Sequence, residues 1–223
     1  MTRRVTIISA LMAWGFACSV FAQGAPQARP PLFLSETWKA LATPPDDHGA
    51  WPASQQGVAS PTLQLTLHGT SGKEIQLVGG SADLYPVNLW TGTTTSPSAA
   101  SLRDRNNFVN LTDPLSKIRW TVRTSGFHQV RPIVKLADGT WLVGDRTTGP
   151  SADFNEADVS IADVRWMKLD IARVVAVGTW VEHPDLSKVD EVGFADLMPG
   201  SGHGPGGYVN VARIDVYGRP VKR

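Results

Sequence analysis

Ile118-Arg119-Trp120-Thr121-Val122-Arg123 is the stretch of this sequence that decides the fold. Three large apolar side chains alternate with two arginines and a threonine. Successive side chains of a β-strand point to opposite faces, so this period of two predicts a strand with one face in a core and the other in water. The stretch therefore favours an antiparallel sheet that covers a hydrophobic core.

Short strand patterns recur along the chain on both sides of this stretch. They cover residues 63–67, 75–78, 130–136, 141–144, 164–171, 174–181, 189–194 and 209–217. Ala137-Asp138-Gly139 predicts a hairpin turn between two of them, and a change of phase near Val211 and Ala212 predicts a β-bulge. Many short strands separated by turns indicate an all-β fold, an antiparallel β-sandwich or jelly roll.

Helical periodicity is almost absent from the sequence. Residues 35–41 predict one short helix with Ser35 as its cap, which Pro44 and Pro45 would end. Trp120, Trp141 and Trp166 fall in strand patterns, and we expect all three in the core.

The composition excludes several classes of protein. The 223 residues carry 21 Lys and Arg against 20 Asp and Glu, which argues against a nucleic-acid partner. A single cysteine excludes a disulfide framework and a cysteine-based zinc site.

The first 22 residues have the pattern of a secretory signal peptide. Arg3 and Arg4 precede an apolar stretch over residues 5–20, and Val20-Phe21-Ala22 has the small-x-small form of a cleavage site. Cys18 raises the alternative of lipid attachment, but Gly15 stands where such a signal carries a branched aliphatic residue. We therefore expect an exported protein, periplasmic or extracellular.

With a signal peptide at its start, the chain is expected to have three parts. Residues 1–22 would be the signal peptide, residues 23–61 an irregular N-terminal arm and residues 62–223 the β-sandwich domain. No later stretch approaches about 18 uninterrupted apolar residues, so we expect no membrane span after the signal peptide.

The order of several segments carries a resemblance. These segments are residues 107–111, 115–120, 166–169, 184–194 and 211–218. Together they resemble galactose-binding-like jelly-roll domains of the carbohydrate-binding-module type, over about residues 84–217. The resemblance implies a β-sandwich on an exported protein that acts on or holds polysaccharide. Modules of this type commonly carry a structural calcium ion, but no calcium ligands can be assigned from this sequence.

Carbohydrate recognition needs flat apolar faces for sugar rings and planar polar groups for their hydroxyls. Trp90 lies beside the Thr- and Ser-rich residues 93–101, which we expect to form a polar loop. The candidate ligand-binding residues are Trp90, Arg103, Arg119, His128, Arg131 and Asp145. A row of arginines on one strand face would suit an acidic polysaccharide.

Two other functions stay open from the sequence. A polysaccharide lyase or glycoside hydrolase of jelly-roll type could use His128, His203, Tyr208 and Arg131, with a base that abstracts a proton and an arginine that neutralises the enolate. A structural or protein-interaction domain of the cell envelope is the third reading. Asn110-Leu111-Thr112 matches a glycosylation sequon, which matters only in a host that glycosylates exported proteins.

Overall fold

The alternating stretch forms the centre of β8 (Lys117–Ser125), as its period predicts. Ile118, Trp120 and Val122 are fully buried, whereas Arg119 and Arg123 remain partly exposed. The computed structural model describes residues 28–43, 45–79, 86–202 and 206–223. The predicted signal peptide and its cleavage site lie outside these residues.

Two antiparallel sheets form a sandwich, and β8 belongs to a sheet of seven strands. This seven-strand sheet has the order β11-β8-β15-β5-β4-β2, and β1 pairs with β15. Its other strands are β1 (Leu32–Thr37), β2 (Ala50–Pro52), β4 (Gln76–Val78), β5 (Asn88–Trp90), β11 (Asn155–Ser160) and β15 (Tyr208–Tyr217). The β15 ladder shifts register between Val211 and Arg213, which confirms the predicted bulge.

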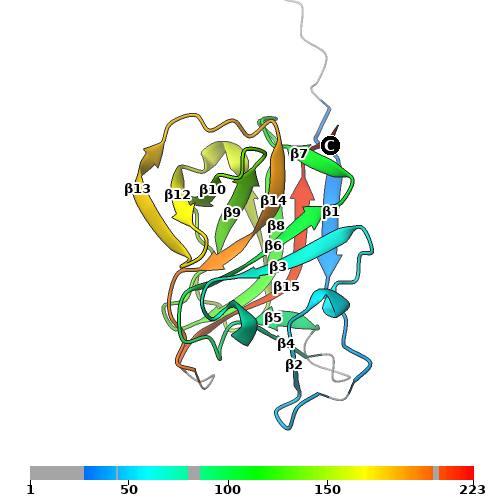
Figure 1. Ribbon diagram of the computed structural model, residues 1–223, viewed down its shortest axis with the longest axis vertical. Helices are drawn as coiled ribbons and strands as arrows, with labels where there is room; N and C mark the ends of the chain where they lie inside the picture. Colours follow the sequence, from blue (N-terminus) through cyan, green and yellow to red (C-terminus); the bar gives the residue numbers. More distant parts are fainter. Residues whose placement is uncertain (1–27, 44, 80–85, 203–205) are drawn as a thin grey trace, which may run out of the picture.

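The second sheet has nine strands. Seven follow the order β13-β12-β10-β9-β14-β6-β3, β7 also pairs with β14, and β16 pairs with β7. Its strands are β3 (Leu63–His68), β6 (Ser98–Asp104), β7 (Asn107–Asn110), β9 (Arg131–Leu136), β10 (Trp141–Gly144), β12 (Trp166–Asp170), β13 (Val175–Val181), β14 (Val189–Asp196) and β16 (Arg219–Lys222). In Figure 1, β13, β12, β10 and β9 lie on one side of the molecule and β1 lies on the other. β9 and β10 form the hairpin that the Asp-Gly pair predicts.

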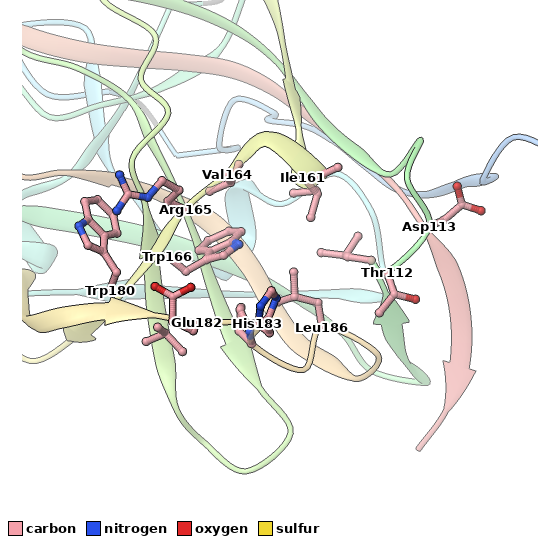
Figure 2. Close-up of a pocket in the computed structure, with 14 residues that line it drawn as sticks. Thr112, Asp113, Ile161, Val164, Arg165, Trp166, Trp180, Glu182, His183 and Leu186 are labelled. Atoms are coloured by element: carbon pink, nitrogen blue, oxygen red, sulfur yellow. The ribbon is translucent and has the colours of Figure 1, made fainter.

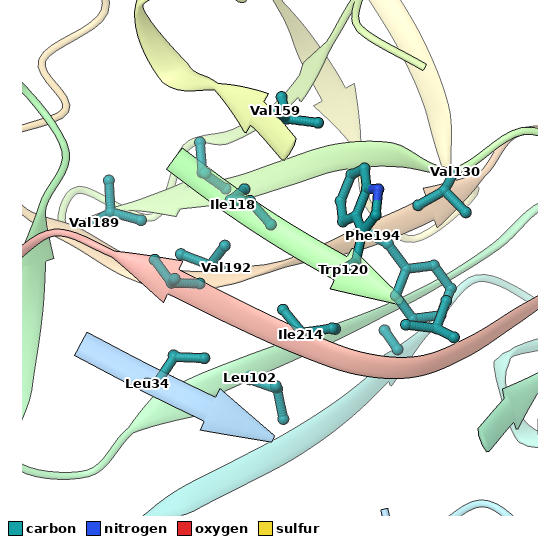
Figure 3. Close-up of a cluster of buried hydrophobic side chains, with 14 of the residues drawn as sticks. Leu34, Leu102, Ile118, Trp120, Val130, Val159, Val189, Val192, Phe194 and Ile214 are labelled. Atoms are coloured by element: carbon teal, nitrogen blue, oxygen red, sulfur yellow. The ribbon is translucent and has the colours of Figure 1, made fainter. Parts of the chain in front are cut away.

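The core lies between the two sheets, where Trp120 packs near Phe194 and Ile214 (Figure 3). Trp120 is fully buried, and its indole Nε1–H donates a 2.9 Å hydrogen bond to Thr148 Oγ1. Each such large side chain contributes about 1.5–3 kcal/mol by leaving water. Trp166 is also buried, so both tryptophans are core residues as predicted.

Two local predictions are wrong. Residues 35–41 do not form a helix: residues 32–37 are β1, which pairs with β15. Residues 98–101 do not belong to a polar loop but to β6, where Ser98 and Ser101 are fully buried. In both cases pairing with a neighbouring strand overrides the local preference.

The rest of the described chain has little helix. It contains three single-turn 3₁₀ helices, η1 (Gln55–Gly57), η2 (Gly72–Glu74) and η3 (Ile161–Asp163). Within the described ranges, no helix has the length and apolar character that crossing a membrane requires.

Candidate functional site

The nine-strand sheet curls strongly toward its outer face, away from the core. His68 of β3 and Trp141 of β10 lie four strand steps apart in the sheet order. In a flat sheet four steps span about 19 Å. The two rings nevertheless meet edge to face, with centroids 4.8 Å apart. The outer face is therefore concave, and we call it the trough.

A second contact closes the trough beside the first, one residue further along the chain from His68. Val174 precedes β13 and is fully buried, and its Cγ2 atom lies only 2.9 Å from where a Cβ on Gly69 would stand. Gly69 directly follows β3, so the two ends of the sheet path meet here. Gly69 has φ +90°, a conformation that favours glycine.

The end of the trough near Val174 is filled by apolar side chains. Its buried residues form a cluster separate from the main core: Ala99, Ile133, Val143, Leu169, Val174 and Ala195. Trp141 and Met167 pack against this cluster while staying partly exposed. This end has no room for a ligand, so the open part of the trough begins at Trp141.

The open end carries a chain of hydrogen-bonded polar side chains that come from the four consecutive strands β9, β14, β6 and β3. Ser101 Oγ lies 2.8 Å from His68 Nε2 and donates a 2.5 Å hydrogen bond to Glu191 Oε2. Lys135 Nζ donates a 2.9 Å bond to Glu191 Oε1 and lies 5.8 Å from the centroid of Trp141. Because the single proton of Ser101 goes to Glu191, His68 Nε2 must donate to Ser101. The His68 Nδ1 atom is then an acceptor.

The titration of these groups follows from their surroundings. Burial lowers the pKa of His68, the positive charge of Lys135 adds to this effect, and the charge of Glu191 opposes it. His68 is therefore neutral at pH 7. The hydrogen bond to Glu191 raises the pKa of Lys135, against the effect of partial burial. The open end thus holds a neutral histidine beside a fixed ion pair.

A second ion cluster borders the open end. Arg103 Nε donates to Asp190 Oδ1 at 2.9 Å, and Lys135 Nζ lies 3.4 Å from Asp190 Oδ2. Arg223 also pairs with Asp190. Burial alone would raise the pKa of Asp190, but the hydrogen bonds and charges of the two arginines lower it. Asp190 and Glu191 are adjacent yet both reach Lys135, because the β14 ladder shifts register between Val189 and Glu191.

Three of the six predicted ligand-binding residues lie on the trough side of the nine-strand sheet. Arg103 borders the open end as described. Arg131 alternates with Ile133 and Lys135 along β9, and its Nη1 atom lies 3.4 Å from the carbonyl oxygens of Gly144 and Asp145. Asp145 follows β10, and its carboxylate accepts a hydrogen bond from the Arg165 backbone N–H.

The other three lie elsewhere. Trp90 and Arg119 are on the outer face of the seven-strand sheet, where Arg119 makes bonds of 2.6 and 3.0 Å to Asp158. His128 is 4% exposed, and its Nδ1 atom lies 2.7 Å from Asp196 Oδ2. The structure therefore does not bring the six residues together into one site.

The residues named for a lyase come from different parts of the fold. His128 is buried in the β8–β9 connection, and its ring lies against Gly207, the residue before Tyr208 at the start of β15. Arg131 belongs to β9 of the other sheet. His203 lies outside the described residues. The serine of the open end does not form a hydrolase triad either, because its hydroxyl donates to Glu191 instead of to His68.

Sequence reasoning missed His68, Glu191 and Trp141 as site residues. We predicted Trp141 to be a core residue, but it lies on the trough side, half-buried against His68. The available signal was alternation in β10, since Leu142 points into the main core and its neighbours Trp141 and Val143 point away from it.

A separate hollow of about 430 Å³ lies beside β12 and the start of the β13–β14 connection (Figure 2). The Arg165 guanidinium stacks on the exposed ring of Trp180 at 4.1 Å, and Glu182 and His183 stand at its rim. Trp166 is only 2% exposed, and Arg165 covers one face of Trp180. This hollow therefore offers a sugar ring little free tryptophan surface.

The part of the chain that the structure describes has no cluster of side chains that matches the expected calcium site. Within the described residues, no three His, Cys, Asp or Glu side chains gather in a way that could hold a metal ion.

Comparison with known proteins gives structural matches only. No protein-family model matches the chain, and no curated protein does. The family 11 carbohydrate-binding module of the cellulosomal cellulase Lic26A-Cel5E of Clostridium thermocellum is 13% identical, with a TM-score of 0.40; the match covers 76% of this chain and 86% of that one. A family 29 carbohydrate-binding module complexed with mannohexaose is 11% identical, with a TM-score of 0.41 and coverage of 82% and 90%.

An exo-β-agarase matches over a smaller part of its own length. It is 12% identical with a TM-score of 0.40, and the match covers 74% of this chain and 24% of that one. The two carbohydrate-binding modules are of the kind that the sequence resemblance named. At this identity and TM-score the matched structures assign neither a family nor a ligand to this chain.

Proposed function

We propose that this protein binds carbohydrate at the open end of the trough, with Trp141 as the platform for a sugar ring. The observation that carries the proposal is the position of Trp141, which is half-buried between His68 and Lys135 beside the Ser101–Glu191 pair. A pyranose has an apolar C–H face and a rim of hydroxyls that both donate and accept. An aromatic ring next to fixed donors and acceptors matches both features.

The polar groups of the open end cover both hydrogen-bond roles. The ammonium group of Lys135 has three N–H donors, one of which is used by Glu191 and one of which points toward Asp190. His68 Nδ1 accepts, and among the described residues no side chain or backbone group donates to it. These groups are fixed by ion pairs and packing before a ligand arrives, which reduces the entropic cost of binding.

Trp141→Ala tests the proposal. Wild-type protein is titrated calorimetrically with a panel of neutral and uronic-acid hexasaccharides, and we expect saturable binding to at least one. Truncation of an aromatic anchor costs about 2 kcal/mol, so Trp141→Ala should weaken that binding about 30-fold.

Trp180→Ala is the matched control, because Trp180 is an exposed tryptophan of the same sheet that faces the separate hollow. Its affinity should stay within about twofold of wild type. The proposal fails if no member of the panel binds, or if Trp141→Ala binds as tightly as wild type while its far-ultraviolet dichroism shows it folded.

We also propose that the protein acts outside the cytoplasm. The support is the sequence of residues 1–22, with two arginines before an apolar stretch and a small-x-small end. Expression of the full chain should yield a mature form that begins at Gln23 in the extracytoplasmic fraction. N-terminal sequencing of an uncleaved cytoplasmic product would contradict this.

A further inference from the structure

The ion clusters at the open end of the trough have their anions inside and their cations outside. The side chains of Asp190 and Glu191 are 9% and 7% exposed, whereas those of Arg103 and Lys135 are 40% and 29% exposed. Arg223 is the third cation, and it pairs with Asp190. Because three cations cover two anions, the surface that a ligand meets at the open end is positive.

Arg103 is the cation that keeps hydrogen-bond donors for a ligand. Its Nε–H donates to Asp190 Oδ1 at 2.9 Å, the one bond that its guanidinium makes within the described part of the chain. A guanidinium has five N–H groups, so the four on Nη1 and Nη2 remain. Arg223, by contrast, donates to the backbone carbonyls of Asp104 and Asp190 as well as to the Asp190 carboxylate.

The free end of Arg103 is on the trough side of the sheet. Leu102 is buried in the main core, so its neighbour Arg103 along β6 faces the opposite way, like Ser101. The two terminal nitrogens of a guanidinium form a planar fork that matches the two oxygens of a carboxylate. Arg103 therefore offers this fork to a ligand in the trough.

A glutamine stands beside Arg103 on the same face. Gln64 of β3 is the ladder partner of Arg103, and its neighbours Leu63 and Leu65 pack in the main core. Gln64 is exposed, and among the described residues no group forms a hydrogen bond with its side chain. Since an amide both donates and accepts, Gln64 can meet a sugar hydroxyl next to the guanidinium.

A short series of contacts connects Arg103 to the proposed platform. Lys135 Nζ lies 5.8 Å from the Trp141 ring centroid and 3.4 Å from Asp190 Oδ2. The other oxygen of Asp190 accepts the hydrogen bond from Arg103. These contacts keep the guanidinium within the length of a short oligosaccharide from the Trp141 ring, so a glycan with one ring on Trp141 reaches Arg103 with a later ring.

We propose that the open end of the trough selects glycans that carry carboxylates, and that Arg103 binds the carboxylate of a uronate residue. The inference rests on the proposed function, because Trp141 supplies the platform and Arg103 supplies the selectivity. The positive surface attracts an acidic chain, and the two Nη groups bind a carboxylate at two points. An uncharged chain gains the stacking contact but not these charged hydrogen bonds.

Hexagalacturonate and its full methyl ester test the inference, because they have the same sugar rings and differ in the charge of their carboxyl groups. Each is titrated into the wild-type protein by calorimetry. We expect the acid to bind at least about 10-fold more tightly than the ester at low salt. The affinity for the acid should fall as sodium chloride rises, whereas that for the ester should not change.

Arg103→Gln should remove the preference for the acid. We expect it to weaken binding of hexagalacturonate about 10- to 100-fold and to leave binding of the ester within about twofold of wild type. Asp190 keeps Lys135 and Arg223 as partners in this variant, so no buried carboxylate is left unpaired.

Arg213→Gln is the matched control. Arg213 Nε donates to Asp215 Oδ1 at 2.9 Å, and the side chain is about as exposed as that of Arg103. Arg213 lies on β15 of the seven-strand sheet, however, so its loss should change the affinity for the acid less than about twofold. Gln64→Ala leaves every ion pair in place and should weaken binding of the acid about 2- to 10-fold. If Arg103→Gln does not fold, Gln64→Ala decides.

The outcomes separate this inference from the proposed function. If the acid and the ester bind equally and Trp141→Ala weakens both, the selectivity is overturned and the platform stands. The selectivity is also overturned if neither hexasaccharide binds, or if folded Arg103→Gln and Gln64→Ala bind the acid as tightly as wild type. If wild type prefers the acid but Trp141→Ala does not weaken its binding, the platform is wrong and the inference fails with it.

Discussion

Gly193→Ala should be among the most destabilising single-methyl additions in this chain. Gly193 lies in β14 opposite Ser101 of β6, where the nine-strand sheet curls into the trough. A Cβ at this position would stand 2.0 Å from the Ala100 carbonyl oxygen and 2.6 Å from Ser101 Cα. Both are backbone atoms of the adjacent strand, so no side-chain rotation can relieve the collision.

The size of the effect follows from what must move. Non-bonded contacts of about 3 Å or more are needed, so β6 and β14 must separate by about 1 Å between Ala99 and Ala195, which are both fully buried. Overpacking costs about 1–3 kcal/mol even where side chains can yield, and each ladder hydrogen bond that is stretched adds about 1 kcal/mol. We expect a loss of about 3–5 kcal/mol, which lowers the melting temperature by about 10 °C in a chain of this length.

Substitutions at two other glycines distinguish the effect of a steric collision from the effect of backbone strain. Gly149→Ala meets nothing within 4 Å and should be neutral or slightly stabilising. Gly139→Ala also meets nothing within 4 Å, but its φ of +89° predicts a strain of about 1–2 kcal/mol. Urea unfolding followed by tryptophan fluorescence gives all three values. If Gly193→Ala loses no more stability than Gly139→Ala, then β6 and β14 do not approach each other this closely at Gly193.

Two further predictions concern His68 and Trp38. Folding lowers the pKa of His68, mainly by burial. The contribution of His68 to the free energy of unfolding is therefore complete above about pH 6.5, the pKa of an unfolded histidine, and is lost as the pH falls toward the lower pKa of the folded state. Between pH 7.5 and 5.0 the wild type should therefore lose more unfolding free energy than His68→Gln; equal losses would contradict the burial of the ring. The buried Trp38 Nε1–H donates to the Val211 carbonyl at 2.7 Å, so Trp38→Phe should cost about 1–3 kcal/mol in chemical denaturation, whereas the exposed Trp180→Phe should cost less than about 0.5 kcal/mol.

The fold class and most strands could be predicted because apolar and polar residues alternate wherever one face of a strand packs against the core and the other faces water. β1 shows where this signal fails. Leu34, Glu36 and Trp38 are buried at every second position, but a charged residue in the middle hides the period. Glu36 is tolerated there because its carboxylate accepts hydrogen bonds from the backbone N–H groups of Ala59 and Ser60. Those partners lie more than 20 residues away and are invisible to a local pattern.

β6 was missed for a different reason. Its residues 98–101 are Ser-Ala-Ala-Ser, a composition typical of a loop. In the structure both faces of this strand are covered, one by the main core and the other by the apolar cluster that fills one end of the trough. Small side chains fit because neighbouring backbones approach closely, as at Gly193. A strand of small residues in the middle of a curled sheet therefore has the same composition as a loop, and the sequence alone does not distinguish the two.

The candidate site could be predicted by residue type but not by location. Trp90 and Arg103 are close in the sequence, yet Trp90 lies in the seven-strand sheet and Arg103 in the nine-strand sheet. In a sandwich, consecutive strands often belong to different sheets, so nearness along the chain does not predict a shared surface. The curl that brings His68 onto Trp141 depends on the sum of many strand twists, and no single motif records it.

The curl also explains why the trough is apolar at one end and polar at the other. Ala99 of β6 pairs with Ala195 of β14, and Gly193 lies two residues before Ala195, so the side chains here are small and Val174 packs into the same apolar cluster. Further along, Glu191 takes the place of these small residues, and its carboxylate is 7% exposed. A buried carboxylate is stable only when paired, so Lys135 and Ser101 must hold it. The groups that make the open end polar are therefore fixed by the demands of folding, and a ligand meets them already in position.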